Sequence, residues 1–91
     1  MKQKNIEKML KKMGYKVHIG DMITKYLHAE KKLDFGISVS MTFEKDKQPT
    51  LNTSSCEMDV HKMRKKADLI SEAVRLVELI VRQDGIEWES D

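Results

Sequence analysis

Apolar residues near the N-terminus recur with the spacing of a helix. The residues concerned are Ile6, Met9, Leu10 and Met13. They fall at i, i+3, i+4 and i+7, which places them on one face of a helix with about 3.6 residues per turn. The pattern predicts a helix over residues 3–13, and Gly14 occupies the C′ position at which glycine commonly ends a helix.

The next segment, residues 15–33, has two interpretations. Its start, YKVHI, alternates apolar and polar residues and predicts a strand at 15–19. Asp21 has a side chain that commonly caps a helix, and the good helix formers AEKK come later, which favours a helix over residues 22–32. The alternative is a hairpin turn at Gly20 and Asp21, which would make MITKYLHA a second strand.

Residues 35–43 carry the clearest strand pattern. The apolar residues on one face of this strand are Phe35, Ile37, Val39, Met41 and Phe43. Glycine, serine and threonine occupy the positions between them, so one face is expected to be buried and the other wet. Pro49 lacks the amide that a ladder needs, which places it in a loop or at a strand start. TLNTSS then returns antiparallel, so the sequence predicts a hairpin of 35–45 with 50–55.

A long helix is predicted over residues 55–83. Ser54 and Glu57 have the spacing of a capping box at its start, and Gly85 lies just beyond its end. The remaining residues, 84–91, form an acidic tail in which Ile86 and Trp88 alternate with polar residues. Two interpretations of this tail remain open, a short added strand and a frayed end.

The long helix carries a heptad seam. Its members are Cys56, Val60, Met63, Ala67, Ile70, Val74, Val77 and Val81. The spacing alternates between 4 and 3, as in coiled coils and in helices that lie across a sheet. From residue 69 to 81, nine of thirteen residues are apolar. These nine cover about 220° of the helix, whereas one buried face needs about 100°.

The predicted length of this helix points to a partner as well. Its 29 residues at about 1.5 Å per residue extend over about 44 Å, and a compact chain of this length is only about 32 Å across. Either the rest of the chain covers the helix on two sides, or a second copy does. We predict a homodimer, and the residues expected in the interface are Leu69, Ala73, Leu76, Leu79 and Ile80.

These elements define one α+β domain over residues 1–91. It consists of an N-terminal helix, a small antiparallel sheet and a long C-terminal helix packed across the sheet and expected in a dimer interface. Apolar residues make up 40% of the chain and charged residues 35%, so the expected core is modest. One cysteine, a charged N-terminus and the lack of an apolar run of about 18 residues predict a cytoplasmic protein without a membrane span.

Charge is distributed unevenly along the chain. Residues 1–66 have 15 Lys and Arg against 8 Asp and Glu, whereas residues 67–91 have 2 against 7. The candidate contacts for an anion or nucleic acid are Lys4, Lys8, Lys11, Lys12, Lys62, Arg64, Lys65 and Lys66. Solvated helix faces explain the same residues, because lysine outnumbers arginine 14 to 3 and arginine is the residue that reads bases.

Residues with catalytic or metal-binding chemistry are sparse. His18, His28, His61 and Cys56 match no zinc spacing, and Cys56 on the seam is expected to serve packing. The chain has no Walker loop, no GxGxxG motif and no nucleophile with an adjacent base. We therefore expect a non-enzymatic binding protein without a cofactor or metal, acting through protein–protein interaction. Sequence-tolerant nucleic-acid binding and inhibition of a larger enzyme are the alternatives.

Overall fold

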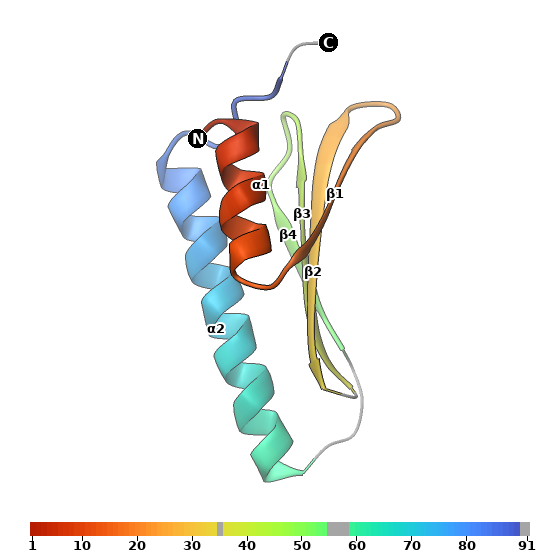
Figure 1. Cartoon of the computed structure of the whole chain (residues 1–91), viewed down its shortest axis with the longest axis vertical. Coiled ribbons are helices and arrows are strands. Elements are labelled where there is room, and N and C mark those ends of the chain that lie inside the picture. Colours follow the sequence, from red (N-terminus) through yellow and green to blue (C-terminus); the bar gives the residue numbers. More distant parts are fainter. Residues whose placement is uncertain (35, 55–58, 90–91) are drawn as a thin grey trace.

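The protein has two layers, a four-stranded sheet and two helices that lie on the same face of it (Figure 1). The computed structural model describes residues 1–34, 36–54 and 59–89. The elements are α1 (Gln3–Lys12), β1 (Lys16–Asp21), β2 (Lys25–Asp34), β3 (Ile37–Glu44), β4 (Thr50–Thr53) and α2 (Val60–Arg82). All neighbouring strands pair antiparallel, in the order β1-β2-β3-β4. The predicted α+β class is therefore confirmed, with α2 packed on the sheet.

Helix α1 ends where the sequence predicts. Gly14 has a φ of +92°, a conformation that side chains other than glycine rarely adopt. The Tyr15 amide donates to the Leu10 carbonyl oxygen at 3.0 Å, which satisfies a carbonyl at the end of the helix. This turn reverses the chain so that it enters β1. Ile6 and Leu10, on the inner face of α1, are fully buried.

The helix expected over residues 22–32 is wrong, because this segment contains most of β2. Lys16 pairs with Glu30 and Asp21 pairs with Lys25, so β1 continues through the predicted turn residues and the chain reverses over 22–24. Burial decides the outcome: Leu27 and Ala29 face the core between two neighbouring strands. Local helix propensity is too weak to outweigh that burial.

Strand β3 has the burial that its sequence pattern predicts. Ile37, Val39, Met41 and Phe43 are buried, and the residues between them are partly exposed. The return strand β4 is shorter than expected, with Val39 opposite Thr53 and Thr42 opposite Thr50. Phe35, at the predicted start of this strand, lies outside the described residues. Strand β4 forms one edge of the sheet and β1 forms the other.

Helix α2 begins at Val60, five residues after the predicted start. Asp59 is its N-cap, since the Asp59 carboxylate accepts a hydrogen bond of 2.9 Å from the Lys62 amide. The predicted capping box includes Glu57, and Glu57 and Cys56 lie outside the described residues. At the other end, the Gly85 amide donates to the Ile80 carbonyl oxygen at 2.9 Å, so the helix ends as predicted.

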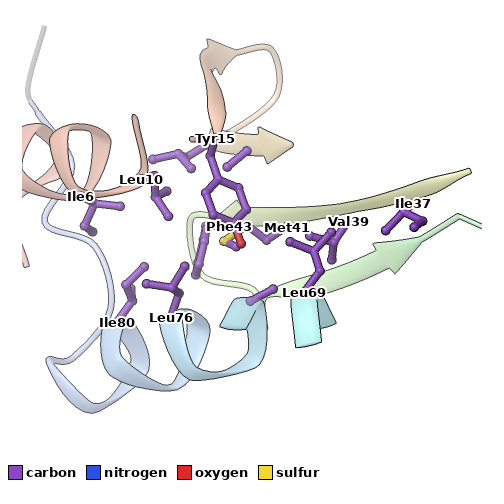
Figure 2. Close-up of a cluster of buried hydrophobic side chains, with 13 residues drawn as sticks. Ile6, Leu10, Tyr15, Ile37, Val39, Met41, Phe43, Leu69, Leu76 and Ile80 are labelled. Carbon is purple, nitrogen blue, oxygen red and sulfur yellow. The ribbon is translucent and has the colours of Figure 1, made fainter. Parts of the chain in front are cut away.

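The core lies between the helices and the sheet (Figure 2). Helix α2 contributes Leu69, Ala73, Leu76 and Ile80, all of which are buried. The side chains that these residues face come from α1 and from the inner face of the sheet. The structure thus buries one face of α2 within its own chain.

The acidic tail joins the N-terminal end of α1. Glu87 forms a parallel bridge with Lys2: the Glu87 amide donates to the Met1 carbonyl oxygen at 2.8 Å, and the Glu87 carbonyl oxygen accepts from the Gln3 amide at 3.0 Å. Ile86 and Trp88 pack against the core. Of the two interpretations of the tail, the added strand is therefore closer to the structure, although it is reduced to a single bridge.

The molecule is elongated, with principal extents of 45 × 25 × 22 Å. Helix α2 runs along the longest of these directions, beside the sheet (Figure 1). The sheet is elongated in the same direction, and the first turns of α2 extend past the end of the sheet (Figure 1). No helix among the described residues is long and apolar enough to cross a membrane.

Candidate functional site

The seam of α2 forms an exposed apolar stripe on the surface. We define the α2 stripe as Val60, Met63, Ala67, Ile70, Val74, Val77 and Val81. Val60 is 65% exposed, Met63 55% and Val81 50%; Ala67 is exposed as well, whereas Ile70, Val74 and Val77 are partly buried. At about 100° per residue, the stripe lies about 120° around the helix from the face that packs on the sheet. It therefore points sideways, roughly parallel to the plane of the sheet.

The α2 stripe faces the β4 side of the molecule. Val81 lines a groove together with Pro49, directly before β4. Lys66, near the other end of the stripe, donates a hydrogen bond from its side chain to the Ser54 carbonyl oxygen, directly after β4. Helix α1 lies on the opposite side, where Met13 and Leu79 line a common groove. The stripe and the β4 edge thus run side by side along one flank of the molecule.

The five residues predicted for the interface have different positions in the structure. Leu69, Ala73, Leu76 and Ile80 belong to the core of the same chain, and Leu79, which is 41% exposed, lies on the α1 side. Periodicity identified two apolar stripes on α2, but it did not show which one the sheet would cover. On α2, the heptad seam remains available to a partner, in addition to Leu79.

The predicted basic residues remain in two separate groups. Lys4, Lys8, Lys11 and Lys12 are exposed on α1, and Arg64 and Lys65 are exposed on α2, where Lys62 and Lys66 are partly buried. Lys4 also forms an ion pair of 3.6 Å with Glu89. A groove beside Met13 is lined by Asp68, Glu72 and Arg75, and none of the eight predicted basic residues lines it.

The face of the sheet opposite the helices carries an aromatic cluster that the sequence analysis missed. The Tyr26 ring lies across Gly20 on the neighbouring strand, where a Cβ atom would come within 2.3 Å of the ring. The Tyr26 and His18 ring centroids are 5.8 Å apart. His28 lies directly opposite His18, and its Nδ1 is 3.0 Å from the Thr42 hydroxyl. The signal in the sequence was the glycine opposite an aromatic residue, which becomes visible only with the correct strand register.

A groove of about 690 Å³ covers this cluster. Its floor includes Tyr26, His28 and Thr42, and its wall is formed by Met22 and Ile23 at the tip of the β1–β2 hairpin. Met22 is 85% exposed and Ile23 is 99% exposed. The tip therefore presents two large apolar side chains directly to solvent, in the same groove as the Tyr26 ring.

A polar cluster inside the helix–sheet layer links three elements. The Tyr15 hydroxyl donates to Oε1 of Glu72 at 3.0 Å, and Lys31 Nζ donates to the same oxygen at 3.1 Å. Lys31 also lies over the Tyr15 ring, 5.4 Å from its centroid. Burial, the hydrogen bond to Glu72 and the negative charge of Glu72 all raise the pKa of the Tyr15 phenol. The arrangement connects the turn after α1 and strand β2 to helix α2.

Among the described residues, no group of three or more His, Cys, Asp or Glu side chains is arranged to hold a metal ion. No protein-family model, curated protein or solved structure matches the chain. The function therefore has to be argued from the surfaces of the molecule, and the α2 stripe beside the β4 edge is one of them.

Proposed function

We propose that this chain is a non-enzymatic protein-interaction module that works as a homodimer through the α2 stripe. The observation that carries the proposal is a second apolar face on α2, continuous from Val60 to Val81, beside the face that the core already uses. Apolar stripes of this length on soluble domains commonly mark protein interfaces. A chain with only a modest core gains stability when such a stripe is covered.

Charges beside the stripe favour a second copy as the partner. Arg64, Ser71 and Glu78 follow one another at intervals of seven residues, along the solvent side of the stripe. In an antiparallel pair of α2 helices centred near Ser71, Arg64 of each copy lies opposite Glu78 of the other. The stripe is thus complementary to itself in charge as well as in apolar character.

Sedimentation of the full chain tests this proposal directly. The expected mass is twice the 10.6 kDa of one chain at micromolar concentration. Val74→Glu, in the middle of the stripe, should give a folded monomer, because a carboxylate would be buried without a partner in the dimer. A strict monomer in the unchanged protein at high concentration would contradict the proposal.

Leu79→Glu is the matched control, since Leu79 is an exposed apolar residue of the same helix that points to the α1 side. This variant should remain dimeric. Dissociation by Leu79→Glu combined with an intact Val74→Glu dimer would place the interface on the α1 side of α2 and contradict the proposal.

The antiparallel arrangement has its own test. Arg64→Glu and Glu78→Arg should each weaken the dimer about tenfold, because like charges then face each other twice. An equimolar mixture of the two variants should recover the dimer, since a mixed pair restores opposite charges at both contacts. Failure of the mixture to recover would exclude this register.

A second candidate function is sequence-tolerant nucleic-acid binding, favoured by the exposure of all four basic residues on α1. Such binding would fall steeply with salt, because it depends on phosphate contacts. The triple substitution of Lys8, Lys11 and Lys12 by Gln should then abolish a mobility shift seen at low salt. The absence of any shift with the unchanged protein at low salt would remove this candidate.

A further inference from the structure

The edge strand β4 has backbone groups that point away from the sheet. Ser54 donates its amide to the Ser38 carbonyl oxygen at 3.2 Å, so the backbone of Ser54 faces β3. In an antiparallel ladder, alternate residues face the same neighbour. The amides and carbonyls of Thr50 and Asn52 therefore face β3, whereas those of Leu51 and Thr53 face outward from the sheet.

This edge has few of the usual protections against pairing, of which the short length of β4, four residues, is one. Native edge strands commonly carry charged side chains, proline or a bulge that discourage association with another strand. Strand β4 has the sequence TLNT, with no charge and no proline inside it. The opposite edge, β1, has Lys16 and Asp21 at its two ends. Of the two edge strands, β4 is thus the one without charged residues that would oppose pairing with another strand.

The positions of α2 and β4 allow one two-fold axis to relate both the two packed α2 helices and the two paired β4 strands of a dimer. Helix α2 packs on β3 and β4. An axis midway between two paired β4 strands would lie about 2.4 Å beyond β4, given a strand spacing of about 4.8 Å. Helix α2 packs more on β3 than on β4, so it lies about 5 to 7 Å from that axis, at or slightly beyond half the usual distance between packed helices.

The two features also match along the length of the molecule. Pro49 at one end of β4 lies near Val81, and Ser54 at the other end is bonded to Lys66. The middle of β4 therefore lies beside the middle of the 66–81 segment of α2. This level is close to Ser71, the centre of the antiparallel helix register.

Interface size supports strand pairing in addition to helix packing. The α2 stripe is about 32 Å long and about 10 Å wide, which corresponds to roughly 320 Å². Stable interfaces commonly bury about 800 Å² on each partner. Helix packing alone therefore falls short, and paired strands directly below the helices would extend the contact.

We infer that β4 pairs antiparallel with β4 of a second copy, so that the two sheets form one continuous sheet with four strands from each copy. Leu51 of one copy exchanges hydrogen bonds with Thr53 of the other, and Asn52 lies on the two-fold axis. This inference rests on the proposed homodimer and specifies the second contact within it.

Amide hydrogen exchange measured by NMR tests the inference residue by residue. In the dimer, the amides of Leu51 and Thr53 should exchange at least tenfold more slowly than in the monomeric Val74→Glu variant. The amides of Thr50 and Asn52 serve as internal controls, because they face β3 in both states. A dimer in which Leu51 and Thr53 exchange as in the monomer would overturn the inference and leave the proposed function intact. A chain that does not dimerise would overturn both.

Thr53→Pro provides an independent test, since it removes the outward amide without removing a bond to β3. The dissociation constant should rise roughly 30-fold, because each dimer loses two hydrogen bonds. Thr53→Ala is the control, as it keeps the amide and should leave dimerisation within about threefold. Equal dissociation constants for a folded Thr53→Pro and for Thr53→Ala, with folding checked by circular dichroism, would contradict strand pairing.

Discussion

The Tyr15 hydroxyl donates a 3.0 Å hydrogen bond to Oε1 of Glu72, which connects the turn between α1 and β1 to the middle of α2. The two residues are 57 positions apart in the sequence. Lys31 of β2 donates to the same carboxylate oxygen, so one acceptor holds together the helix layer and the sheet. The contact is polar, yet Tyr15 is almost fully buried.

Tyr15→Phe should destabilise the fold. The substitution keeps the ring in the core but removes the hydroxyl donor, which leaves Glu72 with Lys31 as its remaining partner. The expected loss is about 1 to 2 kcal/mol in the free energy of unfolding, measured by urea denaturation. Tyr26→Phe, on the open face of the sheet, is the control and should change the free energy of unfolding by less than about 0.5 kcal/mol. Equal effects of the two substitutions would contradict the structural role of the Tyr15 hydroxyl.

Stability should fall at alkaline pH through Tyr15. Burial first, and then the hydrogen bond and negative charge of Glu72, raise the pKa of the Tyr15 phenol above its ordinary value of 10.0. Above pH 10.0 the unfolded chain loses this proton while the folded chain keeps it, so the Tyr15 contribution to stability is complete below that pH and declines above it.

The slope is at most about 1.4 kcal/mol per pH unit for one group. Denaturation at several pH values between 9 and 11.5 should therefore show a steeper decline for the unchanged protein than for Tyr15→Phe. Parallel declines for the two proteins would show that other groups account for the alkaline sensitivity.

Gly20→Ala should disturb the open face of the sheet through Tyr26. A Cβ atom at position 20 would lie 2.3 Å from the Tyr26 ring, so the ring must move away. The expected cost is about 1 kcal/mol in the free energy of unfolding. In the background of Tyr26→Ala the same substitution should cost much less, since no ring occupies the space. Additive effects in this double-mutant cycle would mean that the ring does not lie across Gly20.

Leu76→Ala and Leu79→Ala should differ widely, although both residues were predicted for one interface. Leu76 is buried between α2 and the sheet, so its truncation should cost about 2 to 5 kcal/mol. Leu79 is 41% exposed, and its truncation should cost less than about 1 kcal/mol. Thermal denaturation of the two variants measures the difference. Similar midpoints would contradict the assignment of these residues to the core and to the surface.

Local pattern was sufficient to predict the ends of α1, the burial of β3 and the end of α2. Each of these depends on residues that are close in sequence, such as Gly14 after α1 or the alternation from Ile37 to Phe43. The strand β2 was predicted only as the alternative to a helix, because its formation depends on burial between β1 and β3 and not on the local preference of AEKK for helix.

The candidate site was predictable only in part for the same reason. The sequence showed two apolar stripes on α2, and only the packed sheet distinguishes the face of Leu76 from the face of Val74. The contact of Tyr26 with Gly20 depends on strand register, and that of Tyr15 with Glu72 depends on how the layers pack. None of these relationships has a signature within one segment.

The bridge between Lys2 and Glu87 has a consequence for the order of folding. Closing a loop of about 85 residues costs roughly 4 kcal/mol in its length-dependent entropy, whereas the hairpins of the sheet close loops of a few residues. The four strands follow one another in the sheet in chain order, so their contacts form early and locally. The contact between the tail and α1 should therefore form late in folding and open first in unfolding. Truncation of Ile86 or Trp88 should change the folding rate little and increase the unfolding rate more.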